Sequence, residues 1–470
     1  MLTTHTRNML FIFLGDIGSK ILGFFATTYL ARTLGTGGFG MLNIALAALS
    51  YALLLATNGL PLLGTQKIAA LKRPDPSLVG NIISTRFMLS ILAFALLALV
   101  AFIGLDSGKS DEYRLILIYG LFLFPSALLL DWFFQAKHQM GVISAGRFAQ
   151  MIAYLVFILC FVRNLSDIQM TAWAWVIGGC VNAALLGWIF LNRGNHIAFE
   201  LTSAKILQLW KAAFPLGLAS AISQIVLQFP VLYLAWFASH TDVGIFSAAF
   251  RMMTLLLIFD RIFYTVFFPA ISRCAGQTPE RLEEITNRVL KLVAISALTI
   301  GLVAIFSASW LIPLIFSAQY VEAIPLFQLL SGVFIFTMIN SVIGFTLIGM
   351  GHHKEFTRSV FWGFIAFMIA IFILPPLFGL NGVVSALVIY QFVALMMVTV
   401  FLRRHLVFQW VRNAAFPVLM ATFVLLPVLW RLNLTPVVNF LTIILACLPL
   451  IALAAGFRNQ DWQFIKRTLI

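Results

Sequence analysis

The sequence predicts an all-α membrane protein with about fourteen transmembrane helices, because it is unusually apolar and long apolar runs recur throughout it. Of the 470 residues, 62% are hydrophobic and only 10% are charged, whereas soluble domains carry roughly 25% charged residues. The mean hydropathy is +1.02. Each apolar run of about 20 residues is long enough to cross the hydrocarbon core as a helix. A soluble core does not need this much apolar surface, so we expect the excess to face lipid.

The expected spans are separated by short loops whose charge is unevenly distributed. An even number of spans places both termini on the same side of the membrane. Most Lys and Arg lie in the loops on that side, so the positive-inside rule predicts that both termini are cytoplasmic. This asymmetry explains the net charge of +14 and gives no reason to expect a nucleic-acid partner. The expected spans are residues 9–31, 39–65, 83–104, 115–135, 148–163, 170–191, 212–238, 243–269, 292–315, 323–350, 359–378, 380–402, 413–431 and 436–456.

No catalytic or cofactor-binding motif is present in the sequence. It contains neither a G-x-x-x-x-G-K-[ST] phosphate-binding loop nor an H-E-x-x-H pair. The four cysteines are far apart and form no C-x-x-C pair. The adjacent His352 and His353 lie in an expected cytoplasmic loop, where we expect them to be solvated. We therefore expect a protein that is not an enzyme and that has no catalytic residue, metal ion or cofactor.

An internal repeat divides the chain into similar halves. The segment from Tyr29 through Gly40 to Ala45 matches the segment from Tyr233 through Gly244 to Ala249, with each matching pair 204 residues apart. We expect an N-terminal six-helix bundle at residues 1–205, a C-terminal six-helix bundle at 206–402, and two further helices with a cytoplasmic tail at 403–470. An even number of helices in each copy predicts pseudo-twofold symmetry about the membrane normal, with a cleft between the bundles.

Several short stretches, in this order along the chain, resemble the polysaccharide exporter family. This family includes the Wzx-type O-antigen flippases and belongs to the multidrug, oligosaccharidyl-lipid and polysaccharide exporter superfamily. Ala136 departs from the usual family pattern, which has Gly at that position, and His138 stands where an acidic residue is frequent. The stretches are LARTLG at 30–35, NGL at 58–60, DWFFQA at 131–136, VGIFSAA at 243–249, FPAISR at 268–273 and GLNG at 379–382.

The resemblance implies a flippase of the bacterial inner membrane. Such a protein moves undecaprenyl-diphosphate-linked oligosaccharide, the O-antigen or a related surface polysaccharide repeat unit, by alternating access driven by an ion gradient. Its expected partners are this polyprenyl-diphosphate-linked glycan, membrane lipids, a polysaccharide polymerase and a chain-length regulator. The alternative is a drug or cation antiporter of the same fold, in which Asp16 would be the proton-coupled site.

The candidate site residues are polar and charged side chains inside expected spans. A charge at mid-bilayer costs about 2.5–3.5 kcal/mol on insertion scales, so such residues usually face a wet cavity or a partner. Asp16 and Lys20 lie four residues apart on one helix face, and they are either a packing pair or a cavity-lining pair. Gln224 is the repeat mate of Lys20, and Gln228 lies four residues further on. Arg251 is the candidate for binding phosphate oxygens, which arginine contacts in bidentate geometry.

Four more charged residues are secondary candidates. Arg32 either has a functional role or is an anchor at the outer interface. Asp131 either has a functional role or is a helix-end anchor. Asp260 adjoins Arg261, whose alternative is a side chain that extends towards the cytoplasmic interface.

Overall fold

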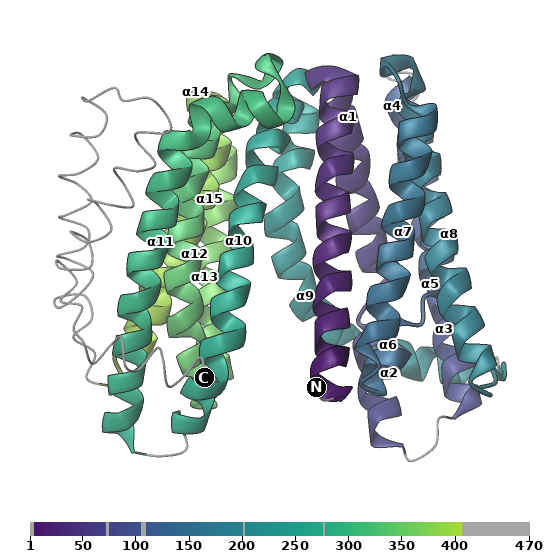
Figure 1. Ribbon diagram of the computed structural model, residues 1–470, viewed down its shortest axis with the longest axis horizontal. Helices are drawn as coiled ribbons and strands as arrows, with labels where there is room; N and C mark the ends of the chain where they lie inside the picture. The colour runs from purple at the N-terminus through teal and green to yellow at the C-terminus, as the bar shows by residue number, and fades with distance from the viewer. Residues whose placement is uncertain (1–3, 72–74, 105–109, 201–202, 276–277, 407–470) are drawn as a thin grey trace. The chain divides into compact units, whose positions relative to one another are not determined.

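The computed structural model describes residues 4–71, 75–104, 110–200, 203–275 and 278–406. Every regular secondary-structure element in these residues is a helix, which confirms the all-α class (Figure 1). Ten of the described helices are long and apolar enough to cross a membrane. The exact number of fourteen spans stays a prediction, and the expected spans 413–431 and 436–456 lie outside the described residues. The chain forms two compact units that divide between Gly244 and Ile245, and the domain boundaries expected from the repeat stay predictions.

Within the residues that the structure describes, the first unit has nine α-helices and the first turn of a tenth. Apolar side chains cover much of its outer surface, including Phe102 and Trp236, which are 73% and 78% exposed. Such exposure suits helices that contact lipid. The helices are α1 (Thr4–Thr57), α2 (Leu60–Ala70), α3 (Pro76–Gly104), α4 (Ser110–Gly120), α5 (Leu123–Leu128), α6 (Asp131–Ala136), α7 (Met140–Phe161), α8 (Ile168–Asn192) and α9 (Ser203–Phe237), with a 3₁₀ turn at Leu165–Asp167 before α8.

The described part of the second unit contains the remainder of α10 and five further α-helices. Its core is a continuous apolar cluster from α10, α11, α12 and α15, in which Val289, Phe334 and Val398 are fully buried. The most extensive packing is between α13 and α15 and between α11 and α12. The helices are α10 (His240–Ala275), α11 (Pro279–Phe316), α12 (Ala323–Gly349), α13 (His353–Ile373), α14 (Pro375–Phe378) and α15 (Leu380–Leu402), with a 3₁₀ turn at Ala318–Tyr320.

The spans expected at 9–31 and 39–65 belong mainly to the single element α1, which is bent at Gly35. A straight helix of 54 residues would be about 80 Å long, far more than the roughly 30 Å of the hydrocarbon core. Gly35 resolves this because its φ of 68° and ψ of −178° are not helical. That backbone region is essentially restricted to glycine, since a Cβ atom clashes there.

We expect Gly35→Ala to lower the free energy of unfolding by about 1–3 kcal/mol, the usual cost of a non-glycine residue held in such a conformation. Gly37→Ala is the matched control on the same helix, because its new Cβ would meet only Thr241 Oγ1, at 3.8 Å. Chemical unfolding in mixed micelles measures both. Equal stability of the two variants would show that the bend does not depend on glycine.

The span expected at 115–135 is interrupted in the structure. It consists of α4, α5 and α6, and the chain is extended at Leu129, where ψ is 127°. Pro125 lies in this span and has no N–H to donate. Hydropathy predicts where a segment crosses the membrane but does not detect such a break. The carbonyl groups released there need other donors, and these are provided by a neighbouring helix as described below.

α1 and the first turn of α10 cross through two glycines that are repeat mates. A Cβ atom on Gly40 would lie 1.8 Å from the carbonyl oxygen of His240, and one on Gly244 would lie 2.0 Å from that of Thr36. His240 follows Thr36 by the same 204 residues that separate Gly244 from Gly40. Each segment therefore makes the same contact with the other, as in an interface with twofold symmetry. This close approach of backbones is possible because neither glycine has a side chain.

Candidate functional site

Three of the candidate residues, Asp16, Lys20 and Arg32, lie on α1. Lys20 and Arg32 are both exposed. Asp16 lies on the same helix one turn before Lys20, but its side chain is outside the described part of the structure. The expected Asp16–Lys20 pair therefore stays a prediction. The exposure of Lys20 leaves its ammonium group accessible on the surface of the first unit.

The two candidate glutamines lie on α9, which packs against α1 within the first unit. Gln224 and Gln228 are each half-buried. Next to Gln224, the carbonyl of Ile225 accepts a hydrogen bond of 3.4 Å from the hydroxyl of Tyr51 on α1. This bond fixes the position of the polar part of α9 relative to α1. Pro230 lies inside the same helix two residues after Gln228, where a proline removes one helical hydrogen bond and permits bending.

The second unit carries three candidate charges on α10. Arg251 and Arg261 are exposed, and ten residues of helix between them correspond to about 15 Å. Asp260 is half-buried and lines the same small pocket as Ser341 of α12. The neighbouring residues Asp260 and Arg261 therefore differ in exposure: the Asp260 side chain is partly enclosed, whereas the Arg261 side chain is exposed.

Asp260 borders a small pocket whose lining is mostly apolar and includes five aromatic residues. The pocket lies between α10, α11 and α12, and Ser341 also lines it. The ring centroids of Tyr264 and Phe345 in its lining are 4.4 Å apart. A carboxylate beside aromatic ring faces suits a cationic group.

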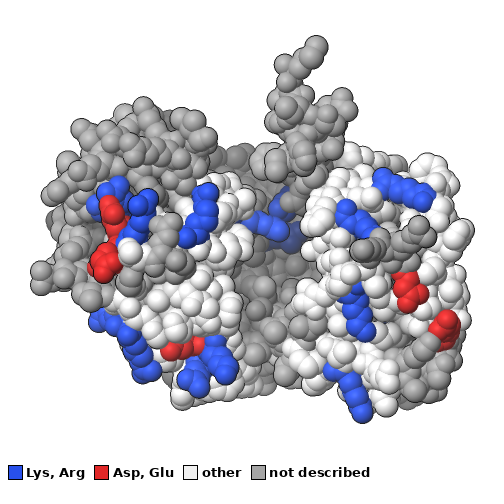
Figure 2. Space-filling view, turned by 90° about the horizontal axis from the view of Figure 1, so that it is seen from below, with Lys and Arg blue, Asp and Glu red and all other residues white. Residues whose placement is uncertain are grey.

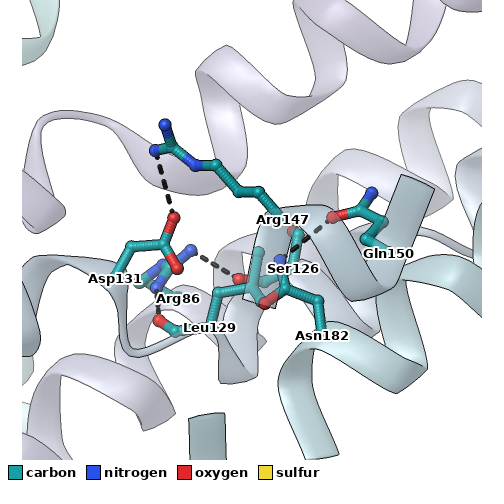
Figure 3. A network of polar contacts seen from close by, with 7 residues as sticks. All are labelled: Arg86, Ser126, Leu129, Asp131, Arg147, Gln150 and Asn182. Atoms are coloured by element: carbon teal, nitrogen blue, oxygen red, sulfur yellow. Dashed lines mark hydrogen bonds and ion pairs between the residues drawn. The ribbon is translucent and has the colours of Figure 1, made fainter. Parts of the chain in front are cut away.

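A buried arginine supplies donors to the break between α5 and α6 (Figure 3). Arg86 on α3 is only 4% exposed. Its guanidinium donates to the carbonyl oxygen of Ser126 at 2.5 Å and to that of Leu129 at 2.9 Å. Unpaired carbonyls are expensive inside a membrane protein, so these bonds hold the interrupted helix in place. The sequence analysis did not include Arg86 among the candidate site residues.

Asp131 begins α6 next to this arginine, as Figure 3 shows. Its Oδ2 atom pairs with the guanidinium of Arg147 on α7 at 3.3 Å, where the two side chains are 27% and 52% exposed. A carboxylate in the first turn of a helix is favoured by the helix dipole. The geometry therefore favours the interpretation of Asp131 as a helix-end anchor.

A second buried polar contact joins α7 to α8. The side-chain amide of Asn182 donates to Oε1 of Gln150 at 3.0 Å. A Cβ atom on Gly146 would lie 2.3 Å from Oδ1 of Asn182, so the helices approach closely at this point. Interhelical amide bonds and small residues are typical of helix packing in membranes. We therefore infer that the Gln150–Asn182 pair serves helix packing. In the sequence, the pair could have been noticed only as two polar residues inside apolar runs.

Basic residues gather at one end of the first unit, where α2, α6 and α8 end and α7 begins. Lys67 lies in the last turn of α2, and Lys137 and Arg193 follow the ends of α6 and α8. Arg193 donates to the side chain of Gln139 and lies over the ring of Phe134 at 5.9 Å. Figure 2 shows Lys and Arg outnumbering Asp and Glu on the face seen from below, to which these helix ends belong. These are the loops expected on the cytoplasmic side.

The family model described as "Polysaccharide biosynthesis protein" matches residues 5–275. This match covers more than half of the chain and includes both α1 and α10. The chain belongs to the polysaccharide biosynthesis protein family. The resemblance stated from the sequence stretches is thereby confirmed, and this family member is a multi-pass membrane protein.

Two curated relatives of this polysaccharide biosynthesis protein are named "Putative O-antigen transporter". The one from Escherichia coli K12 is 19% identical over 85% of this chain and 97% of the relative. The one from Shigella dysenteriae is 24% identical over 81% of this chain and 96% of the relative. The similarity therefore extends over nearly the whole length of both relatives.

Solved structures share the fold of this polysaccharide biosynthesis protein. The lipid II flippase MurJ in an inward closed conformation has a TM-score of 0.75 at 13% identity, and the alignment covers 95% of this chain and 98% of MurJ. An inward-facing multidrug resistance MATE family transporter of the MOP superfamily has a TM-score of 0.60 at 16% identity, with 82% and 94% covered. At these identities the likeness concerns the fold alone. It supports the fold class expected from the sequence, an all-α fold with many membrane helices.

Proposed function

We propose that this protein is a flippase that moves undecaprenyl-diphosphate-linked oligosaccharide across the bacterial inner membrane. The O-antigen or a related surface polysaccharide repeat unit would be the glycan. Membership of the polysaccharide biosynthesis family over residues 5–275 is the observation that carries this proposal. Relatives named as O-antigen transporters over more than 80% of the chain support it further.

The mechanism that we propose is alternating access coupled to an ion gradient. Two six-helix bundles, residues 1–205 and 206–402, would open in turn to the two sides, with both termini cytoplasmic and two further helices in 403–470, for about fourteen spans in all. The glycan-diphosphate head would cross between the bundles while the polyprenyl tail stays in lipid. A polymerase and a chain-length regulator are the proposed partners on the far side.

Lys20 and Arg251 are the side chains that we propose to neutralise the diphosphate. An uncompensated anion is strongly disfavoured in a low-dielectric passage. Both side chains are exposed on their own units, so neither must break out of a core to meet a substrate. Arginine offers a bidentate fork to phosphate oxygens, and lysine offers a compact point charge. Gln224 and Gln228 would contribute uncharged hydrogen-bonding groups to the same passage.

We expect Lys20→Ala and Arg251→Ala each to reduce glycan export by roughly 10- to 100-fold, which is the worth of one hydrogen bond to a charged group. The measurement is surface polysaccharide in a deletion strain of the native host that carries each variant, with membrane protein level measured by immunoblot.

Two kinds of control separate substrate contact from general damage. Arg273→Ala removes an exposed arginine at the end of the same helix α10, where it donates to its own helix at the carbonyl of Pro269. This variant is expected to export normally. Lys20→Arg and Arg251→Lys keep the charge and are expected to retain part of the activity. Full export by both alanine variants at normal protein level would remove these residues from the mechanism.

The aromatic pocket beside Asp260 favours a second candidate function, a drug or cation antiporter of the same fold. The pocket places one carboxylate among aromatic side chains, and both kinds of group attract cations. Deletion of the gene distinguishes the two functions. Loss of surface glycan with unchanged drug sensitivity supports the flippase, whereas increased drug sensitivity with intact glycan supports the antiporter.

A further inference from the structure

Three potential metal ligands from separate parts of the sequence meet at one end of the second unit. His352 precedes α13, Glu355 lies in its first turn, and His405 follows α15. One ligand atom from each residue lies within 4.8 Å of the other two. From sequence we expected the His352–His353 pair to be solvated, because it lies in an expected cytoplasmic loop. We propose that His352, Glu355 and His405 form a binding site for a divalent transition metal ion of the zinc class.

The backbone around these residues is well defined on both sides. The N–H of His352 donates to the carbonyl of Leu347 at 2.9 Å, and that of Glu355 donates to the carbonyl of His352 at 3.1 Å. On the other side, the N–H of His405 donates to the carbonyl of Leu402 at 3.0 Å. α13 and α15 make the most extensive helix contact in the described structure. The ligands therefore lie at the ends of two helices that pack closely together.

The side chains already approach one another closely. Nε2 of His405 lies 2.9 Å from Oε2 of Glu355. The rings of His352 and His405 are stacked, with centroids 3.8 Å apart and planes at 23°. Neutral imidazole is the form that binds a metal ion. All three side chains are half-buried, which leaves a path for an ion and a water ligand.

Two imidazole nitrogens and one carboxylate oxygen match the ligand set of an open zinc site. Zinc takes these atoms at about 2.0–2.2 Å, so tetrahedral ligand atoms lie roughly 3.3 Å apart. A ring nitrogen binds a metal ion in the plane of its ring, so the stacked rings of His352 and His405 must turn out of parallel for both nitrogens to reach one ion. The exposed Arg403 and Arg404 nearby oppose a cation, but the Arg404 guanidinium lies over the ring of Phe401 at 5.3 Å. The Glu355 carboxylate offsets part of this charge.

A bound ion would join two segments that are distant in the chain. It would tie the turn between α12 and α13 to the end of α15, just before residue 407. A crosslink of this kind stabilises the folded state by binding it in preference to the unfolded chain. The proposed role is structural, and it does not depend on the transported substrate.

The test is metal binding by the full-length protein, purified without a histidine tag and stripped with a chelator. Zinc is added, unbound ion is removed, and the bound metal is counted by mass spectrometry. We expect about one ion per chain in the wild-type protein. Removal of a ligand in His405→Ala or Glu355→Gln is expected to weaken binding at least as much as loss of a second-shell partner, which is about 10- to 100-fold. Glu355→Gln keeps the size of the side chain and guards against a folding defect.

His353→Ala is the matched control, because His353 is an exposed histidine adjacent to the proposed ligand His352. It is expected to bind zinc as the wild type does. Cobalt(II) provides a second readout, since a tetrahedral site gives visible absorption bands that the His405→Ala variant should lack. No zinc on the wild type, equal binding by Glu355→Gln and His405→Ala, or equal loss in His353→Ala would each overturn the proposal.

Discussion

Gly40→Ala is expected to destabilise the protein by more than about 3 kcal/mol and to abolish accumulation of folded protein. The new methyl group would lie 1.8 Å from the carbonyl oxygen of His240 and 2.8 Å from its carbonyl carbon. Both are backbone atoms, so no side chain can rotate away, and α1 must separate from the first turn of α10. Overpacking usually costs 1–3 kcal/mol and exceeds this range when a backbone must move.

The control substitutions are Gly187→Ala on α8 and Gly332→Ala on α12. A Cβ atom at either position meets nothing within 4 Å, and alanine is favoured over glycine in a helix by about 1 kcal/mol. These variants should equal or exceed the wild type in stability. Fluorescence-detected size exclusion after heating measures all three. A Gly40→Ala variant as stable as the two controls would show that the crossing is looser than the structure indicates.

Arg86→Met is expected to lower the free energy of unfolding by about 2–5 kcal/mol. It removes the Arg86 donors from the carbonyls of Ser126 and Leu129. The Ser126 carbonyl keeps its bond from the N–H of Leu129 at 3.2 Å, whereas the Leu129 carbonyl loses its donor, and a buried acceptor left unpaired costs roughly 1–3 kcal/mol. It also removes the positive charge beside Asp131, whose Oδ1 atom is buried and has no hydrogen-bond partner among the described residues. Methionine fills a similar volume, so the loss reports on the polar contacts more than on a cavity.

Arg147→Met provides the comparison for Arg86, because it breaks the ion pair with Asp131 at the more exposed partner. Exposed pairs contribute about 0–1 kcal/mol, so this variant should stay close to the wild type. Chemical unfolding in mixed micelles gives both values. If Arg147→Met were the more damaging substitution, the support of the α5–α6 break would have to be assigned to Arg147.

The helical class and most helix positions could be predicted from sequence, because the membrane requires long apolar segments with internally paired backbones. The bend at Gly35 and the break at Leu129 could not, because hydropathy averages over a window and does not register the conformation of one residue. Arg86 was visible as a charge in an apolar run, but the acceptors that explain it lie about 40 residues later.

The candidate site was predicted less completely than the fold. The sequence identified Lys20, Arg251 and Asp260 as charges at membrane depth, and the structure places the first two on exposed surfaces and the third beside an aromatic pocket. Their roles stay predictions. The meeting of His352 with His405 had no sequence signal, because it depends on the packing of α13 against α15.

The reciprocal contact of Gly40 with Gly244 bears on how a chain of this kind can arise. A surface that fits its own repeat mate also fits a second identical molecule, so a half-length ancestor carrying one such segment would already have been able to form a homodimer. Gene duplication and fusion would then have converted that dimer into one polypeptide without creating a new interface. Since fusion, the two glycines would have been constrained as a pair, because enlarging either one blocks the same point of contact.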